Sequence, residues 1–243
     1  MDYDRAGAFA VFDRQDSGCV SYGIEVAGRR LFVKTATTPA AHESLGRAIH
    51  FHHSVRHPVI VAPIDVVDTP DRRQLIYPWH DGVVLNHATV DGSDRCGLDR
   101  FHQQYSSDIL SAIDAILDAH EAVAAAGFVS VDLYDGCFLY DFDCRTMRLI
   151  DLDEYRPGPF TVESDRLPGS TPYMAPEELV HGARVDERTT VFHLGRTAAQ
   201  LLTDPNLSSA QSDVVEAATG IDPATRYPTV AAMAAAWRSV APA

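Results

Sequence analysis

Two aspartates in the second half of the chain stand in polar loops beside short apolar runs. Asp132 lies just before the apolar run 138–140, and Asp151 directly follows the run 147–150. Such a pair suits a metal–phosphate site, because one carboxylate can orient a hydroxyl nucleophile while the other holds a divalent cation that bridges phosphates. Acids in loops are common, so the two positions indicate this chemistry only if other segments support it.

Lys34 is the single lysine among the 20 basic side chains of the chain. Lysine presents a compact ammonium on a flexible stem, whereas arginine presents a planar fork, so the two are not interchangeable at a tight site. Lys34 ends the apolar run 31–33 that follows the turn Ala27-Gly28. This pattern predicts a lysine at the end of a strand, projecting from a buried wall. A surface lysine without a special role is the alternative.

The composition limits the classes of partner. The chain has 243 residues, 46% of them hydrophobic, and a net charge of −14. This charge argues against a nucleic-acid partner, which needs a basic surface, and favours a cationic partner, although acidity also serves solubility. No apolar run approaches the length of a membrane span, and the N-terminus lacks a signal-peptide pattern. The cysteines show no CxxC spacing, so we expect a cytoplasmic protein: Cys19, Cys96, Cys137 and Cys144.

The first third of the chain is strand-like. Short apolar runs at 7–12, 19–26 and 30–35 predict strands, and a helix is predicted from Pro39, with apolar residues three and four positions apart. A further strand pair is predicted at 59–67 and 74–77.

From Ser106 onward the pattern is mainly helical. A long helix with Ile109, Ile113 and Val123 on its apolar face is predicted to end at Gly127. Two short strands follow, at 138–140 and 147–150, and the last third returns to helices. The expected order is a β-rich part with one helix, a short crossing and a helical part.

The segment 169–177, which closes with Ala175-Pro176-Glu177, resembles the end of a protein-kinase activation segment. The segments 222–227, 191–195 and 57–61 are also similar to kinase segments. On these residues the chain resembles a divergent, small, single-domain member of the bacterial eukaryotic-like serine/threonine protein kinases. The resemblance implies a buried ion pair between Glu177 and Arg226.

The resemblance also implies a fold and its division. It is the α+β, two-lobed protein-kinase-like fold, with a small antiparallel sheet lobe that carries one helix and a larger helical lobe. Residues 1–77 would form the N-terminal lobe and residues 78–243 the C-terminal lobe, together one catalytic domain.

The resemblance further implies a site for ATP and Mg²⁺. Lys34 takes the place of the lysine that binds the α- and β-phosphates, Asp132 that of the catalytic aspartate, and Asp151 that of the magnesium-binding aspartate. The other implied nucleotide contacts are Gly18 and Val20 in the covering loop, the Pro78 carbonyl and His80 amide at the hinge, and Leu139 beneath the adenine.

Several positions depart from the kinase pattern. Gly18 alone remains of the three-glycine loop, and Phe32 replaces a small residue over the adenine. Cys137 stands where an asparagine would hold a second magnesium ion, and a neutral thiol is a poor ligand for a hard cation. Our hypothesis is that Asp135, or Asp153 in place of a glycine, supplies the missing oxygen.

The helix acid that usually pairs with the strand lysine is also displaced. Ala48 stands at its expected position, and Glu43, one helical turn earlier, is the only acid in the segment. Glu43 is therefore the candidate partner of Lys34.

Three functions are compatible with these residues. The leading one is ATP- and magnesium-dependent transfer of the γ-phosphate to a serine or threonine hydroxyl of a protein. The second keeps the chemistry but uses a hydroxyl on a small molecule, such as an aminoglycoside-like cation or a metabolite. The third is a pseudokinase that acts as a binding module.

Overall fold

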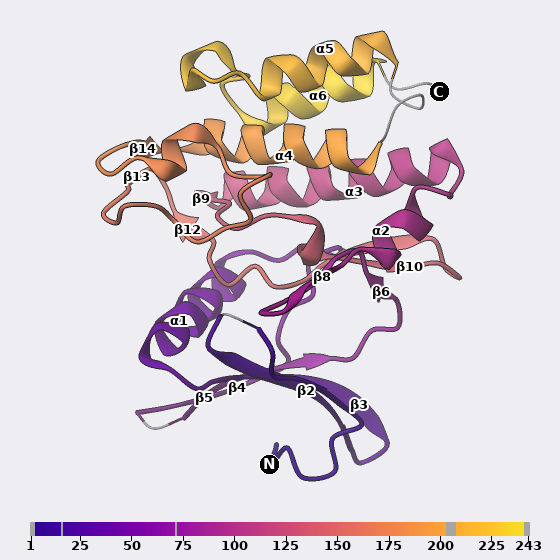
Figure 1. Ribbon diagram of the computed structural model, residues 1–243, viewed down its shortest axis with the longest axis vertical. Helices are drawn as coiled ribbons and strands as arrows, with labels where there is room; N and C mark the ends of the chain where they lie inside the picture. The colour runs from indigo at the N-terminus through magenta and orange to yellow at the C-terminus, as the bar shows by residue number, and fades with distance from the viewer. Residues whose placement is uncertain (1–2, 16, 71, 203–207, 241–243) are drawn as a thin grey trace.

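The computed structural model describes residues 3–15, 17–70, 72–202 and 208–240. These residues form an α+β structure with a five-stranded antiparallel sheet and six α-helices. The sheet and helix α1 (Pro39–Ser54) lie at one end, and the long helices lie at the other (Figure 1). None of the helices in the described residues has the length and apolar character needed to cross a lipid bilayer.

The five-stranded sheet has the order β1-β2-β3-β5-β4. Its strands are β1 (Ala10–Phe12), β2 (Cys19–Val26), β3 (Arg29–Ala36), β4 (Asp65–Thr69) and β5 (Arg72–Pro78). Ala27 and Gly28 both have positive φ and join β2 to β3 in a tight hairpin, because such turns match the twist of the flanking strands. The predicted strand at 19–26 and the turn after it are thus confirmed.

Helix α1 packs on one face of this sheet. Thr38 caps the helix by accepting a hydrogen bond from the Ala41 amide, and Pro39 occupies the first turn, where a missing N–H costs nothing. The buried Ala41, Leu45 and Ala48 then pack against the sheet residues Cys19, Leu75 and Tyr77. The spacing of three and four residues that predicted the helix therefore forms its buried face.

The largest hydrophobic core of the described residues lies mainly in the helical part. Its helices are α2 (Cys96–Phe101), α3 (Ser106–Ala125), α4 (Glu187–Leu201), α5 (Ser209–Ala218) and α6 (Val230–Val240). The predicted apolar face of α3 is buried in that core, and α3 and α4 run side by side (Figure 1). Gly127 has φ 78° just beyond α3, so it ends the helix as predicted.

Short strands and 3₁₀ turns make up the rest of the regular structure in the described residues. The strands are β6 (Val83–Val84), β7 (His87–Thr89), β8 (Gly92–Asp94), β9 (Phe128–Val129), β10 (Phe138–Asp141), β11 (Thr146–Leu149), β12 (Arg156–Pro157), β13 (Phe160–Thr161) and β14 (Arg184–Val185). The 3₁₀ turns are η1 (Asp135–Cys137), η2 (Pro176–Leu179) and η3 (Pro223–Thr225). Strands β6, β10 and β11 form one small sheet. That sheet places the loop before β10 next to the loop after β11.

The strand predicted at 59–67 is wrong in extent, because β4 covers only Asp65–Thr69. Pro63 lies inside the predicted strand, and a proline removes an amide donor from the ladder. The segment before it pairs elsewhere: the Leu149 amide donates to the Val59 carbonyl at 2.8 Å, and the Val61 amide donates to the Leu149 carbonyl at 2.9 Å. This segment therefore ties the region of the large sheet to β11.

Candidate active site

Two adjoining cavities lie between the sheet and the helical part. The apolar cavity has a volume of about 420 Å³, and Phe32, Trp79 and Leu139 contribute to its walls. The polar cavity has a volume of about 1020 Å³, and Asp132 and Ser170 contribute to its lining. Six polar residues line both cavities, and we call them the junction: Gln15, Lys34, Asn86, Tyr134, Asp151 and Asp153.

Lys34 lies at the centre of the junction. In β3 it pairs with Ser21 of β2 and Leu75 of β5, and its side chain is only 7% exposed. Its ammonium donates a hydrogen bond to Asp151 and forms an ion pair with Asp153 at 2.5 Å. Burial lowers the pKa of Lys34, but the charges of the two aspartates outweigh it and hold the pKa well above its usual value. The predicted strand-end lysine that projects from a buried wall is thus confirmed.

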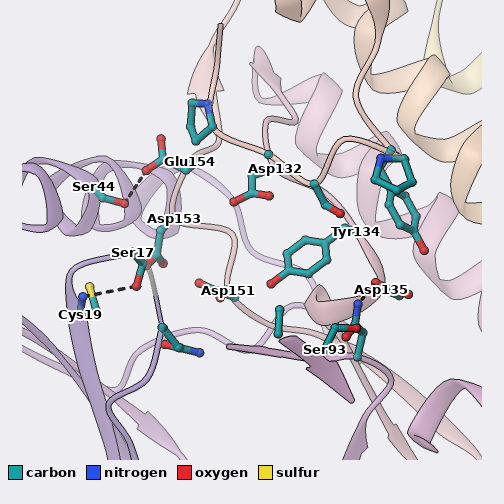
Figure 2. A pocket seen from close by; sticks show the side chains of 18 of the residues that line it. Ser17, Cys19, Ser44, Ser93, Asp132, Tyr134, Asp135, Asp151, Asp153 and Glu154 are labelled. Atoms are coloured by element: carbon teal, nitrogen blue, oxygen red, sulfur yellow. Dashed lines mark hydrogen bonds between the residues drawn. The ribbon is translucent and has the colours of Figure 1, made fainter. Parts of the chain in front are cut away.

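Asp132 and Asp151 both have a left-handed backbone, with φ of 58° and 59°. This conformation is uncommon for residues other than glycine, and strained residues of this kind cluster at functional sites. Asp132 is half-buried and the Asp151 side chain is 36% exposed, so both carboxylates can reach the polar cavity. Figure 2 shows Asp132, Asp151 and Tyr134 around one space. The structure therefore brings together the two aspartates that the sequence singled out.

Cys137 connects the two loops that carry these aspartates. Its buried sulfur lies 3.4 Å from the Asp132 carbonyl oxygen and 3.8 Å from the Asp151 carbonyl oxygen. Burial raises the pKa of the Cys137 thiol well above its usual range, so the side chain stays a neutral donor. Where the kinase pattern has a metal ligand, this chain has a link between two backbones.

The two predicted substitutes for that ligand have other partners. Asp135 is 1% exposed; one oxygen accepts from Asn86 at 2.8 Å and the other from Arg95 at 2.9 Å. Both oxygens of Asp135 therefore already have donors from the protein, and its metal-binding role stays a prediction. Asp153 is also buried and faces Lys34. Burial raises the pKa of Asp153 to about 6, and the charge of Lys34 opposes this rise.

Val20 was predicted to contact the nucleotide, but its neighbour Ser21 is the residue that lines the apolar cavity. Successive side chains of a strand point to opposite faces, and Val20 packs with Tyr22 and Val33 on the face away from the cavities. Ser21 and Cys19 of the same strand line the apolar and polar cavities. The strand itself was predicted correctly, so the error lies in the register.

Gly18 ends the loop between β1 and β2 and contacts Thr37 and Thr38. A Cβ at this position, where φ is 69°, would lie 2.4 Å from the Thr38 hydroxyl oxygen. The Gly18 carbonyl also accepts from the Thr37 amide and hydroxyl. Of the described residues of this loop, Gln15 and Ser17 line the polar cavity, whereas Gly18 lines neither cavity.

The other predicted nucleotide contacts line the apolar cavity: Pro78, His80 and Leu139. The Trp79 amide donates to the Arg30 carbonyl at 3.1 Å. Because hydrogen-bonded and non-bonded pairs alternate along antiparallel strands, the neighbouring pair of Leu31 and Pro78 is non-bonded. The Pro78 carbonyl therefore points away from β3 and stays available to a ligand.

Sequence reasoning missed the hairpin β7–β8, which contributes to both cavity walls through the segment 86–96. The Val90 amide donates to the Arg14 carbonyl at 2.8 Å, and Arg14 pairs with Asp91. The hairpin is thus tied to the loop before β2. The Asp91-Gly92 pair is a turn signal that could have located it.

Glu43 does not pair with Lys34. It is exposed on α1 and lines the polar cavity, whereas the ion-pair partners of Lys34 within the described part of the chain are Asp151 and Asp153. Ala48, the other position considered, is buried against the sheet. The predicted helix acid is therefore absent from the contacts of Lys34.

Glu177 and Arg226 form the predicted ion pair, and it is buried. The guanidinium donates to the two carboxylate oxygens at 2.7 and 2.9 Å, and the side chains are 8% and 0% exposed. The Glu177–Arg226 prediction is thus confirmed.

A buried network that the sequence did not indicate supports the loop that carries Asp132. Glu178 accepts from the His193 ring at 2.6 Å, and the Ser130 hydroxyl lies 2.8 Å from the other ring nitrogen. Ser130 is two residues before Asp132, so the network fixes the backbone that carries this aspartate.

No protein-family model matches the chain, and no curated protein matches it closely enough to indicate a relationship.

Proposed function

We propose that the protein is an ATP- and magnesium-dependent phosphotransferase with a two-lobed, protein-kinase-like fold, which transfers the γ-phosphate to a serine or threonine hydroxyl. One observation carries the proposal. Lys34, Asp132 and Asp151 come from three separate segments and line one polar cavity, and Lys34 and Asp151 also line the adjoining apolar cavity. Phosphoryl transfer needs these groups in one place: a cation for the phosphates, a carboxylate for the metal and a carboxylate for the nucleophile.

The apolar cavity has the chemistry that a nucleotide base requires. Away from the junction its walls include aromatic and aliphatic side chains, and Phe32 lies among other rings, 6.3 Å from Tyr77 and 6.4 Å from Trp79 between centroids. The Pro78 carbonyl supplies an acceptor on the open side of the strand. A base bound here would direct its phosphates toward the junction and Lys34.

Asp151 is the residue that would hold magnesium. Among the described residues, no group of three or more histidine, cysteine or acidic side chains could form a metal centre. Mg²⁺ does not need one, because it commonly binds through one or two carboxylates and the phosphates of its substrate. The partly exposed Asp151 carboxylate fits that requirement. When bound, the ion would neutralise charge on the phosphates.

Asp132 would orient the acceptor hydroxyl and take its proton. Its backbone position is fixed from two sides, by the Cys137 sulfur and by the network around Ser130. A fixed carboxylate at the polar cavity is the requirement for general-base assistance, which contributes about 10²- to 10⁴-fold to the rate. Cytoplasmic action is part of this proposal and stays a prediction.

The test is transfer of labelled phosphate from ATP with Mg²⁺. The protein is incubated alone, with a mixture of basic proteins, and with amine-rich small molecules that carry hydroxyls. We expect labelling of a protein, and a loss of about 10²-fold or more in Asp132→Asn. Labelling confined to the small molecules would favour the second acceptor class. Transfer that survives Asp132→Asn would refute the mechanism, and a chain with no transfer and no nucleotide-dependent thermal shift would be a binding module.

A further inference from the structure

Helix α1 contacts the loop 151–154 with a base on the helix and an acid on the loop. Arg47 of α1 donates to both oxygens of Glu154, at 2.6 and 2.8 Å, and Ser44 donates to the same carboxylate at 2.7 Å. Figure 2 shows the bond between Ser44 and Glu154 beside Asp153. Arg156 adds a further ion pair to Glu154 at 3.3 Å. The side of α1 that faces this loop therefore presents hydrogen-bond donors.

The same loop supplies the counter-charges of Lys34. A buried ammonium is costly unless an anion lies beside it, and Asp151 and Asp153 both lie beside this one. The two aspartates differ in exposure: the Asp151 side chain is 36% exposed and the Asp153 side chain is 7% exposed. Asp151 can therefore exchange Lys34 for another partner from the cavity, whereas Asp153 is enclosed with Lys34.

We infer that Asp153 is the positioning residue that holds the Lys34 ammonium at the phosphate site, in place of an acid on helix α1. This inference rests on the phosphotransferase function proposed above. The two aspartates divide the work: Asp151 is left to the metal, and Asp153 keeps Lys34 in place. Because Glu154 fixes α1 through Arg47, one loop sets the positions of both the lysine and the helix.

Two other assignments agree less well with the contacts. Glu43 is the acid of α1 that lines the polar cavity, but it is exposed and Lys34 is enclosed by the loop. If Asp153 bound the metal, Lys34 would keep only Asp151 as a counter-charge, and Asp151 would bind the same metal. The geometry therefore favours Asp153 as the partner of the lysine.

The chain provides an unusual probe, because Lys34 is its single lysine. Protein made with ¹⁵N-labelled lysine has one side-chain ammonium resonance, recorded at fixed pH without nucleotide or metal. We expect Asp153→Asn to shift or broaden this resonance, because the ammonium loses its enclosed ion pair. Glu43→Gln is the matched control: it removes one carboxylate charge from the same cavity and should leave the resonance unchanged. A thermal melt of each variant checks that the fold is retained.

The second measurement separates positioning of Lys34 from metal binding. If Asp153 positions Lys34, Asp153→Asn lowers kcat/KM for ATP by about 10- to 100-fold, the range found when a residue that orients a metal-ligating side chain is removed, while the half-saturating Mg²⁺ concentration stays the same. A Mg²⁺ requirement raised about tenfold or more would overturn the inference in favour of a metal ligand.

The resonance decides the inference even if the proposed function fails. A Lys34 resonance unaffected by Asp153→Asn, or shifted as much by Glu43→Gln, would overturn it. A wild-type chain that binds no nucleotide would refute the phosphotransferase, and the effect of Asp153→Asn on the resonance would still establish Asp153 as the partner of Lys34.

Discussion

The ion pair between Glu177 and Arg226 allows a quantitative test of how this fold is held together. Besides its two bonds to Glu177, the Arg226 guanidinium donates to the carbonyls of Gly220 at 2.7 Å, Arg188 at 3.1 Å and Ile221 at 3.2 Å. One side chain thus joins the segment ending at Glu177, the start of α4 and the loop before η3. We predict that Arg226→Ala is strongly destabilising.

The magnitude follows from what the substitution leaves behind. Burial raises the pKa of Glu177, and hydrogen bonds led by those from Arg226 more than offset this, so its pKa lies below the ordinary value. Without Arg226, a buried carboxylate has lost its counter-charge, which costs about 3 to 5 kcal/mol. For a chain of this length, each kcal/mol lowers Tm by about 2 to 4 °C. The expected loss in Tm is therefore about 6 to 20 °C.

The assay is thermal unfolding at pH 7, with Arg5→Ala as the matched control. Arg5 pairs with Asp13 at 2.7 Å, as Arg226 does with Glu177, but its side chain and that of Asp13 are 49% and 44% exposed. Exposed pairs contribute about 0 to 1 kcal/mol, so Arg5→Ala should change Tm by a few degrees at most.

The stability difference between wild type and Arg226→Ala should depend on pH, and its direction follows from the pKa of Glu177. Because the folded pKa of Glu177 is lowered, its contribution is present above the unfolded pKa of about 4.3 and is lost as the pH falls below it. The gap between wild type and Arg226→Ala should therefore narrow in acid. Equal losses in Arg226→Ala and Arg5→Ala, or a gap independent of pH, would refute the reasoning from burial.

Three further predictions concern other parts of the molecule. Burial lowers the pKa of His120 to about 4. The neutral ring therefore contributes about 3 kcal/mol to the free energy of unfolding above pH 6.5, and this contribution is lost as the pH falls to 4. Urea unfolding of His120→Gln should show a weaker pH dependence than that of the wild type. A Cβ at Gly136 would lie 2.4 Å from the Tyr134 ring, so Gly136→Ala should cost about 1 to 3 kcal/mol in thermal unfolding, and a cost that persists in Tyr134→Ala would contradict this contact. Ser21→Leu should weaken binding of a fluorescent nucleotide at least tenfold by filling the apolar cavity, whereas Val20→Leu should not, and equal effects would show that the register is wrong.

The pattern of apolar residues along the chain predicted the strands and helix faces that depend on neighbouring residues in the sequence. Strand β2 begins and ends where its apolar run does, and the face of α3 is buried at its predicted positions. Hydrophobic periodicity carries this information because the repeat of a strand or helix is fixed by its backbone. The Glu177–Arg226 pair was predicted in another way, from the resemblance of two distant segments to a kinase, and periodicity alone could not have found it.

Register and ion-pair partners were harder to predict. Val20 and Ser21 are adjacent in a correctly predicted strand, yet only the packing of Tyr22 and Val33 decides which of the two faces the cavity. A shift of one residue moves every side chain of a strand to the other face of the sheet. A short apolar run does not indicate which of the two faces is buried. The sequence could therefore indicate the strand but not the residue that lines the site.

The sequence by itself determined which side chains are chemically distinctive: one lysine, and two aspartates in polar loops. The tertiary structure decided how the charges are distributed among partners. Asp135 faces Arg95, and Asp153 faces Lys34, although both were expected at a metal. Coulomb energy depends on distance and burial, and these are set only when strands, helices and loops from distant parts of the chain pack together.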